Sequence, residues 1–168
     1  MTVGPPRSLK ARALQLLAQR EHSALELRRK LLDHVRRQEA ATAVTTGRRA
    51  GPSSPEGEAE VDALLAWLQG EGHLSEARFV ESRVRARAAR YGNLRIRHEL
   101  DQHGLSLPAA DQGALAASEL ERARAVWARK FDGALPADAA GRARQARFLA
   151  GRGFSPDVIR RVLRGADD

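Results

Sequence analysis

One short pattern occurs three times in the chain, and it constrains the fold more than any other feature. An apolar residue, two basic residues, a variable residue and a leucine follow one another at positions 27–31, 96–100 and 159–163. The two apolar residues of each copy are four positions apart, so on a helix they share one face. We therefore expect them in the core, with the basic residues between them pointing outward.

Each copy also carries the start signal of a helix. A bulky residue and a helix-capping or small residue precede it, as His22-Ser23, Tyr91-Gly92 and Phe154-Ser155. In this order the bulky side chain packs against the apolar residue of the first helical turns, which fixes the angle at which the chain enters the helix. The repeated object is therefore a helical hairpin. Three such units stacked in a row predict an elongated body with a long surface.

The rest of the chain has helical periodicity as well. No run alternates apolar with polar residues as a half-buried strand does. We therefore predict an all-α protein of nine helices. Start and stop signals place them at residues 8–19, from 23 onward, 58–69, 75–90, 93–103, 108–117, 118–131, up to 150 after a turn at 132–138, and 155–163.

Residues 38–57 (QEAATAVTTGRRAGPSSPEG) differ from their surroundings. They lose the apolar periodicity and gather Gly, Pro, Ser and Thr. This composition is typical of a flexible connection between folded parts. We predict a flexible insert at 38–57.

The charge balance indicates an anionic partner. The chain has 29 Lys and Arg against 21 Asp and Glu, a net charge of +8. Nearly all the basic residues are arginine, whose planar guanidinium forms paired hydrogen bonds with phosphate and carboxylate. Residues 76–99 and 142–164 are especially basic. Our candidates for binding a partner or nucleic acid are Arg28, Arg29, Arg83, Arg87, Arg90, Arg95, Arg97, Arg160 and Arg161.

Several classes of function do not fit the sequence. The chain has no cysteine, hence no disulfide, thiol nucleophile or cysteine-bound metal. It has no phosphate-cradling glycine loop, and its histidines are scattered. We expect no enzyme, no cofactor, no metal and no small-molecule substrate. With no signal peptide and no apolar run of about 20 residues, we expect a soluble cytoplasmic protein without a membrane partner.

Three segments resemble the RecX regulatory proteins of bacteria in order, spacing and coverage of the chain. They are RALQLLAQREHSALELRRKLLDH, VDALLAWLQGEGHLSEARFVESRVRARAARYGNLRIRHELDQHGLS and RFLAGRGFSPDVIRRVL. The segment at 72–79 and the turn at 153–155 fall where that family has them. Two features depart from the family: the insert is longer, and Asn93 stands where a proline often follows the Tyr-Gly pair.

The resemblance implies a fold of three tandem three-helix repeats, at residues 8–70 with the insert, 74–117 and 118–164. It implies a regulator of the RecA recombinase that binds the RecA–DNA filament. Such a protein inhibits ATP hydrolysis, strand exchange and co-protease activity in DNA repair, recombination and the SOS response. The implied partners are the RecA filament and single-stranded DNA, with double-stranded DNA as a further candidate. An elongated basic body suits a filament groove beside DNA phosphates.

Two other functions remain open from the residues alone. A DNA-binding transcription factor of the helix-turn-helix type also uses helical hairpins and arginines. Its recognition helix usually offers Asn, Gln or Ser beside Arg, whereas the repeated pattern offers mainly Arg and His. An RNA-binding helical repeat would need exposed aromatic residues, which are few here.

Overall fold

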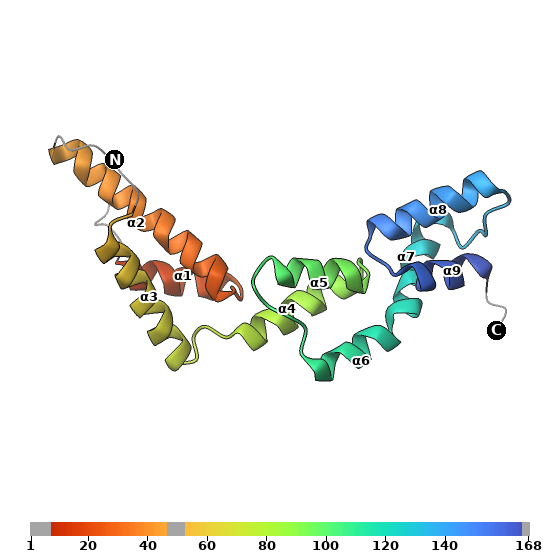
Figure 1. Cartoon of the computed structure of the whole chain (residues 1–168), viewed down its shortest axis with the longest axis horizontal. Coiled ribbons are helices and arrows are strands. Elements are labelled where there is room, and N and C mark those ends of the chain that lie inside the picture. The colour runs from red at the N-terminus through yellow and green to blue at the C-terminus, as the bar shows by residue number, and fades with distance from the viewer. Residues whose placement is uncertain (1–7, 47–52, 166–168) are drawn as a thin grey trace. The chain divides into compact units, whose positions relative to one another are not determined.

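The computed structural model describes residues 8–46 and 53–165, so residues 47–52 of the predicted insert lie outside the described residues. Within those two ranges it contains nine helices and no strand, and the all-α prediction is confirmed (Figure 1). The helices are α1 (Leu9–Gln19), α2 (Ala24–Thr46), α3 (Pro55–Gly70), α4 (Glu76–Ala88), α5 (Asn93–Asp101), α6 (Ala109–Ala117), α7 (Glu119–Phe131), α8 (Ala139–Gly151) and α9 (Pro156–Arg164). None of the described helices combines the length and the apolar character needed to cross a membrane.

The predicted insert at 38–57 is wrong at both of its ends. Residues 38–46 continue α2, and residues 55–57 already belong to α3. The reason is that Gln, Glu and Ala, which make up most of residues 38–46, favour helix even without apolar periodicity. The carboxylate of Glu39 also accepts hydrogen bonds from the backbone N–H (3.2 Å) and the hydroxyl (2.6 Å) of Ser54, which ties the start of α3 to α2.

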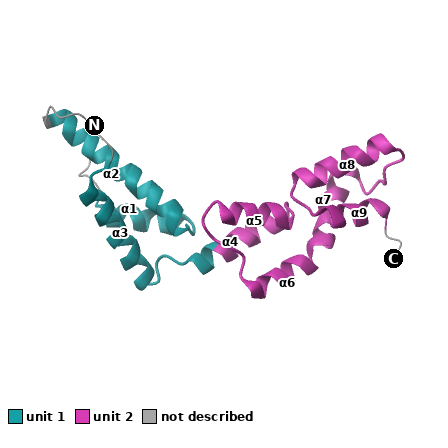
Figure 2. Cartoon of the chain, in the orientation of Figure 1, with its two compact units in different colours: residues 1–79 teal, residues 80–168 magenta. Residues whose placement is uncertain are grey.

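The chain forms two compact units, residues 1–79 and residues 80–168, and the division falls within α4 (Figure 2). In unit 1, α1 and α3 both pack against α2. The buried side chains follow one another at helical spacing, so three amphipathic helices share one core. That core consists of Leu9, Ala13, Leu16, Leu27, Leu31, Val35, Val61, Leu65, Leu68 and Leu74.

Unit 2 has its own core, in which α7, α8 and α9 pack on one another while α6 packs on α7. The core residues are Ala123, Val126, Trp127, Leu149, Phe154, Val158, Ile159, Val162 and Leu163. The indole N–H of Trp127 donates to Oε1 of Gln145 at 2.7 Å, so this buried polar pair is satisfied.

The apolar positions of the repeated pattern are buried, as predicted. In all three copies the apolar pair is at most 8% exposed. The copies lie on α2, α5 and α9. When the helices are grouped in threes along the chain, the pattern falls on the second helix of the first two groups but on the third helix of the last. It therefore marks the helix that follows a tight hairpin turn, and its place within a three-helix group varies.

Two of these hairpin turns cross in close contact within unit 2. The N–H of Gly92 donates to the carbonyl of Arg152 (2.9 Å), and the N–H of Leu94 donates to the carbonyl of Gly153 (3.1 Å). A Cβ on Gly92 would lie 2.2 Å from the Gly153 oxygen, and a Cβ on Gly153 would lie 2.4 Å from Cβ of Arg95. Only glycine at both positions lets the α4–α5 and α8–α9 turns approach so closely.

A buried carboxylate supports the crossing. Glu119, at the start of α7, is 6% exposed and accepts the N–H of Asn93 at the start of α5 (2.9 Å). Its other oxygen lies 3.5 Å from the hydroxyl of Ser155, which caps α9. A negative charge beside two helix N-termini is favourable. Asn93 can make this hydrogen bond whereas a proline at position 93 could not, because proline has no N–H to donate to Glu119.

Arg122 of α7 joins the same elements. Its guanidinium donates to the carbonyls of Tyr91 (2.8 Å), Ala88 (3.0 Å) and Leu115 (3.1 Å), and to Oδ1 of Asn93 (2.5 Å). Burial lowers the pKa of Arg122 from its ordinary value. This arginine is therefore a cross-link between α4, α6 and α7 within unit 2.

Replacing Gly92 with alanine should destabilise unit 2, because the new methyl group would overlap the Gly153 carbonyl. We expect a loss of about 1–3 kcal/mol in the free energy of unfolding, measured in urea. The matched control is Gly113→Ala inside α6, where a Cβ would meet nothing within 4 Å. There alanine should add about 0.5–1 kcal/mol. Equal effects of the two substitutions would contradict the close crossing.

Candidate interface

Two of the nine candidate arginines lie in unit 1, on α2, and one of them is neutralised. Nε and Nη2 of Arg28 donate to the two carboxylate oxygens of Asp62 on α3, at 2.7 and 3.1 Å. The hydrogen bond and the opposite charge raise the pKa of Arg28 and lower that of Asp62. Arg29 is exposed. The structure thus assigns Arg28 to the contact between α2 and α3.

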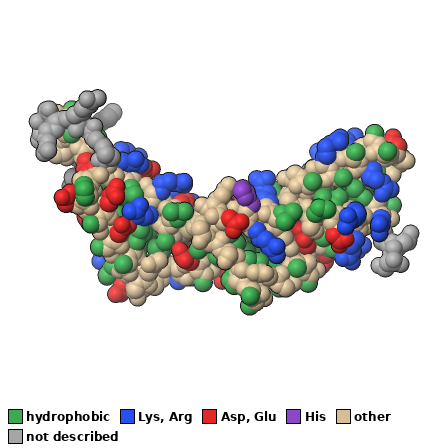
Figure 3. Space-filling view, in the orientation of Figure 1, with side chains coloured by type: hydrophobic (Ala, Val, Ile, Leu, Met, Phe, Trp, Pro, Cys, Tyr) green, Lys and Arg blue, Asp and Glu red, His purple; other side chains and the backbone are tan. Residues whose placement is uncertain are grey.

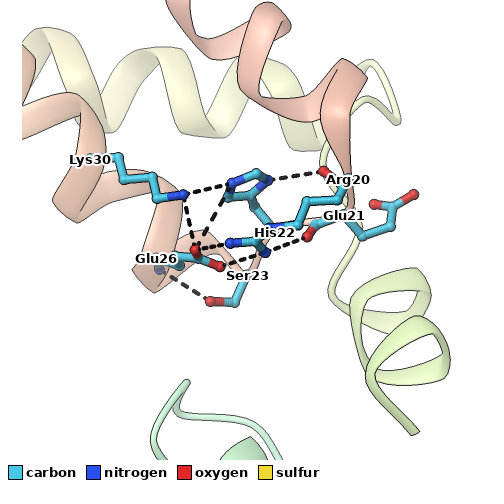
Figure 4. Close-up of polar contacts among 6 residues, drawn as sticks. All are labelled: Arg20, Glu21, His22, Ser23, Glu26 and Lys30. Carbon is cyan, nitrogen blue, oxygen red and sulfur yellow. Dashed lines mark hydrogen bonds and ion pairs between the residues drawn. The ribbon is translucent and has the colours of Figure 1, made fainter. Parts of the chain in front are cut away.

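A second charged network in unit 1 surrounds Glu26 near the start of α2 (Figure 4). Glu26 is 7% exposed; it pairs with Arg20 and, at 3.1 Å, with Nζ of Lys30. The buried imidazole of His22 lies 2.9 Å from the carbonyl of Arg20 through Nδ1 and 3.1 Å from Lys30 through Nε2. The hydroxyl of Ser23 accepts the N–H of Glu26 (3.1 Å), so the predicted cap at Ser23 is confirmed.

The pKa values in this network follow from its charges. Burial alone would raise the pKa of the Glu26 carboxyl, but hydrogen bonds from Arg20 and Lys30 outweigh it and lower the pKa from 4.5 to about 2. Burial lowers the pKa of His22, so the imidazole is neutral at pH 7. Its Nδ1–H then donates to the Arg20 carbonyl, and Nε2 accepts from Lys30. The ion pair between Arg20, at the end of α1, and Glu26 of α2 joins the two helices.

In unit 2, an open depression of about 650 Å³ brings together three candidates, Arg83, Arg87 and Arg95. His98 and Glu99 also line it. The Nε atoms of Arg87 and Arg95 lie 2.8 and 3.4 Å from the two Glu99 oxygens. This first depression is therefore basic but partly neutralised.

The ring of Tyr91, in the α4–α5 turn, gathers arginines from three elements. The guanidinium carbons of Arg95, Arg152 and Arg87 lie 4.5, 5.5 and 5.6 Å from its centroid. Cations over an aromatic face are attracted by the negative charge of the π system. Tyr91 thereby orients side chains of α4, α5 and the α8–α9 turn towards one place.

The candidate Arg90 lies in a second depression, of about 310 Å³. The residues that line it are Arg90, Val126, Arg129, Lys130, Phe148 and Arg152. Four of these described residues are cationic and none is a carboxylate. This second depression therefore concentrates positive charge more strongly than the first.

Three of the candidates in unit 2 lie outside both depressions: Arg97, Arg160 and Arg161. All three are exposed, as predicted for the basic residues of the repeated pattern. Arg160 lies 3.2 Å from Asp157, one turn earlier in α9. Figure 3 shows Lys and Arg side chains gathered over α8 and α9.

Arg129, Lys130 and Arg152 are not among the residues predicted from the sequence. A signal for Arg152 was present, because it falls inside the basic stretch 142–164. Arg129 and Lys130 stand in the last turn of α7, where cations commonly offset the helix dipole. Their approach to Arg90 depends on how α4, α7 and α8 pack, which no local pattern reveals.

The fold and this basic surface define a helical protein built of repeated three-helix domains. Residues 75–113 match the family model described as RecX, second three-helix domain. Residues 117–163 match the one described as RecX, third three-helix domain. Together these matches cover just over half of the chain.

Whole-chain relatives agree with these matches. The chain is 48% identical to the Regulatory protein RecX of Ralstonia nicotianae, over 96% of this chain and 90% of that protein. It is 49% identical to that of Leptothrix cholodnii, over 97% and 92%. It is 45% identical to that of Pseudomonas putida, over 96% and 93%. The chain belongs to the RecX family of regulatory proteins.

Acid titration should reveal the contribution of Glu26. Its folded-state pKa of about 2 lies below the ordinary 4.5, so the stabilisation is complete above pH 4.5 and is lost as pH falls through about 2. Glu26→Gln should therefore cost on the order of 3 kcal/mol at pH 7 and progressively less towards pH 2, measured by urea unfolding. Glu60→Gln, at an exposed position of α3, is the control and should be nearly neutral. A penalty for Glu26→Gln that is independent of pH would contradict the network.

Proposed function

We propose that the chain regulates the RecA recombinase by binding the RecA–DNA filament. Bound there, it inhibits ATP hydrolysis, strand exchange and co-protease activity, and so limits recombination and the SOS response in DNA repair. The observation that carries the proposal is membership of the RecX family over nearly the whole chain. The relatives bear the name of a regulatory protein, which favours a binding role over catalysis.

The charges of unit 2 support an anionic partner. The filament displays DNA phosphates, and each cation that meets a phosphate releases a condensed counterion. Arginines on α4, α5 and α9 and in the α4–α5 and α8–α9 turns supply such cations. The net charge of +8 also attracts an anionic partner before contact and so speeds association. The proposal places the protein in the cytoplasm, where such filaments form.

We further propose that the three repeats comprise residues 8–70, 74–117 and 118–164. The family matches at 75–113 and 117–163 support the last two. The three-helix packing of α1, α2 and α3 supports the first.

The direct test is the ATPase rate of RecA on single-stranded DNA, titrated with this protein. We expect a dose-dependent fall in the rate at protein concentrations below that of RecA. An unchanged rate would contradict the proposal. A preference of several kcal/mol for one duplex sequence would favour the transcription-factor alternative.

Reversing the charge of Arg160 and Arg161 should weaken the inhibition while leaving the fold intact, because both side chains are exposed. We expect the double Arg→Glu variant to need about tenfold more protein for half-inhibition, through lost attraction and new repulsion. Arg36→Glu/Arg37→Glu, on α2, makes the same change in net charge at exposed positions and should cost less than about twofold. Circular dichroism checks folding. If both variants inhibit alike, α9 is not part of the interface.

A further inference from the structure

The second depression of unit 2 lies where three helices end. α4 ends at Ala88, α7 at Phe131 and α8 at Gly151, and four cations follow or end these helices: Arg90, Arg129, Lys130 and Arg152. Cations at helix C-termini have an ordinary structural role, because they offset the partial negative charge of the carbonyls. These four cations can also bind an anion if their contacts within the protein leave their charge unneutralised.

Two of the four side chains are fixed by carbonyl contacts. Arg129 donates through Nη2 to the carbonyl of Ala89 (2.8 Å) and through Nε to that of Ala125 (3.2 Å). Arg152 donates through Nη1 to the carbonyl of Arg90 (3.5 Å). Carbonyls are dipoles, so these bonds orient the guanidinium groups without neutralising them.

Aromatic rings complete the positioning of Arg152. Its guanidinium carbon lies 5.5 Å from the Tyr91 centroid and 5.2 Å from that of Phe148. Phe148 is in turn held edge-on by Phe131, with centroids 5.4 Å apart. Two guanidinium groups are thus preorganised in a hollow that has no carboxylate in its described lining.

The first depression provides an internal comparison. There Glu99 separates Arg87 and Arg95, so part of the positive charge is cancelled. In the second depression the like charges repel one another, and an anion would relieve the repulsion. Planar guanidinium forks match the paired oxygens of a phosphate.

The partner is a strand more readily than a single small anion, because one arginine from each depression lies over the same tyrosine ring. Arg95 lines the first depression and Arg152 the second, and both guanidinium groups lie over the ring of Tyr91. A polymer with regularly spaced phosphates can engage both hollows at once. We infer that the second depression binds neighbouring backbone phosphates of a single nucleic-acid strand that continues past Tyr91 to the first depression.

This inference deepens the proposed function by assigning the DNA contact, and it is tested without RecA. The probe is a fluorescent oligothymidylate of about 20 nucleotides, and its anisotropy gives the affinity over a range of salt concentrations. Each phosphate contact contributes about −0.7 to the slope of log affinity against log salt. Arg90→Ala/Lys130→Ala removes the two exposed cations that are not fixed by carbonyls, and should make the slope shallower by about 1.4.

Two further variants serve as a graded test and as a charge control. Lys130→Ala alone should make the slope shallower by about 0.7. Arg36→Ala/Arg37→Ala, with the same loss of charge on α2, should change the slope by less than half as much as Arg90→Ala/Lys130→Ala. Equal slopes for the two double variants would overturn the inference, since the affinity would then reflect net charge alone.

The outcomes also separate this inference from the proposed function. If the parent binds no oligothymidylate, yet Arg90→Ala/Lys130→Ala abolishes RecA inhibition, the depression binds an acidic protein surface; the inference fails and the proposed function stands. If the slopes change as expected but the RecA ATPase rate is unaffected by the parent, the phosphate site stands and the proposed function fails.

Discussion

The close approach of two backbone turns at Gly92 and Gly153 is the constraint on which the rest of unit 2 depends. Two hydrogen bonds join the turns, and neither position has room for a Cβ. The starts of α5 and α9 thereby come near Glu119, which lies between two partially positive helix ends. The guanidinium of Arg122 then binds the carbonyls that the turn exposes. Steric fit comes first here, and the polar contacts follow from it.

The crossing also sets the electrostatics of the surface. It places Arg152 beside Tyr91, and the ends of α4 and α7 add Arg90 and Arg129 to the same hollow. In unit 1, by contrast, Arg20 pairs with Glu26 and Arg28 pairs with Asp62. Basic residues of the two units therefore have different roles. Within the described residues, it is the presence or absence of a carboxylate partner that distinguishes them.

Part of this was predictable from sequence. The buried pair of each repeated pattern, such as Ile96 with Leu100, follows from spacing alone, as does the cap at Ser23. The length of α2 was not predicted, because residues 38–46 have helix propensity but no apolar period. The ion pair of Arg28 and the convergence on the second depression were not predictable either. Both join residues far apart in the chain, and only packing brings such residues together.

The central claim is that the positive charge of unit 2 beside the crossing is what meets the filament. The most direct measurement is arginine modification by a dicarbonyl reagent, followed by mass spectrometry, with and without RecA assembled on single-stranded DNA. The account predicts that the filament slows modification of Arg90 and Arg152 severalfold, while Arg36 in unit 1 reacts at an unchanged rate. Protection confined to unit 1, or none in unit 2, would contradict it.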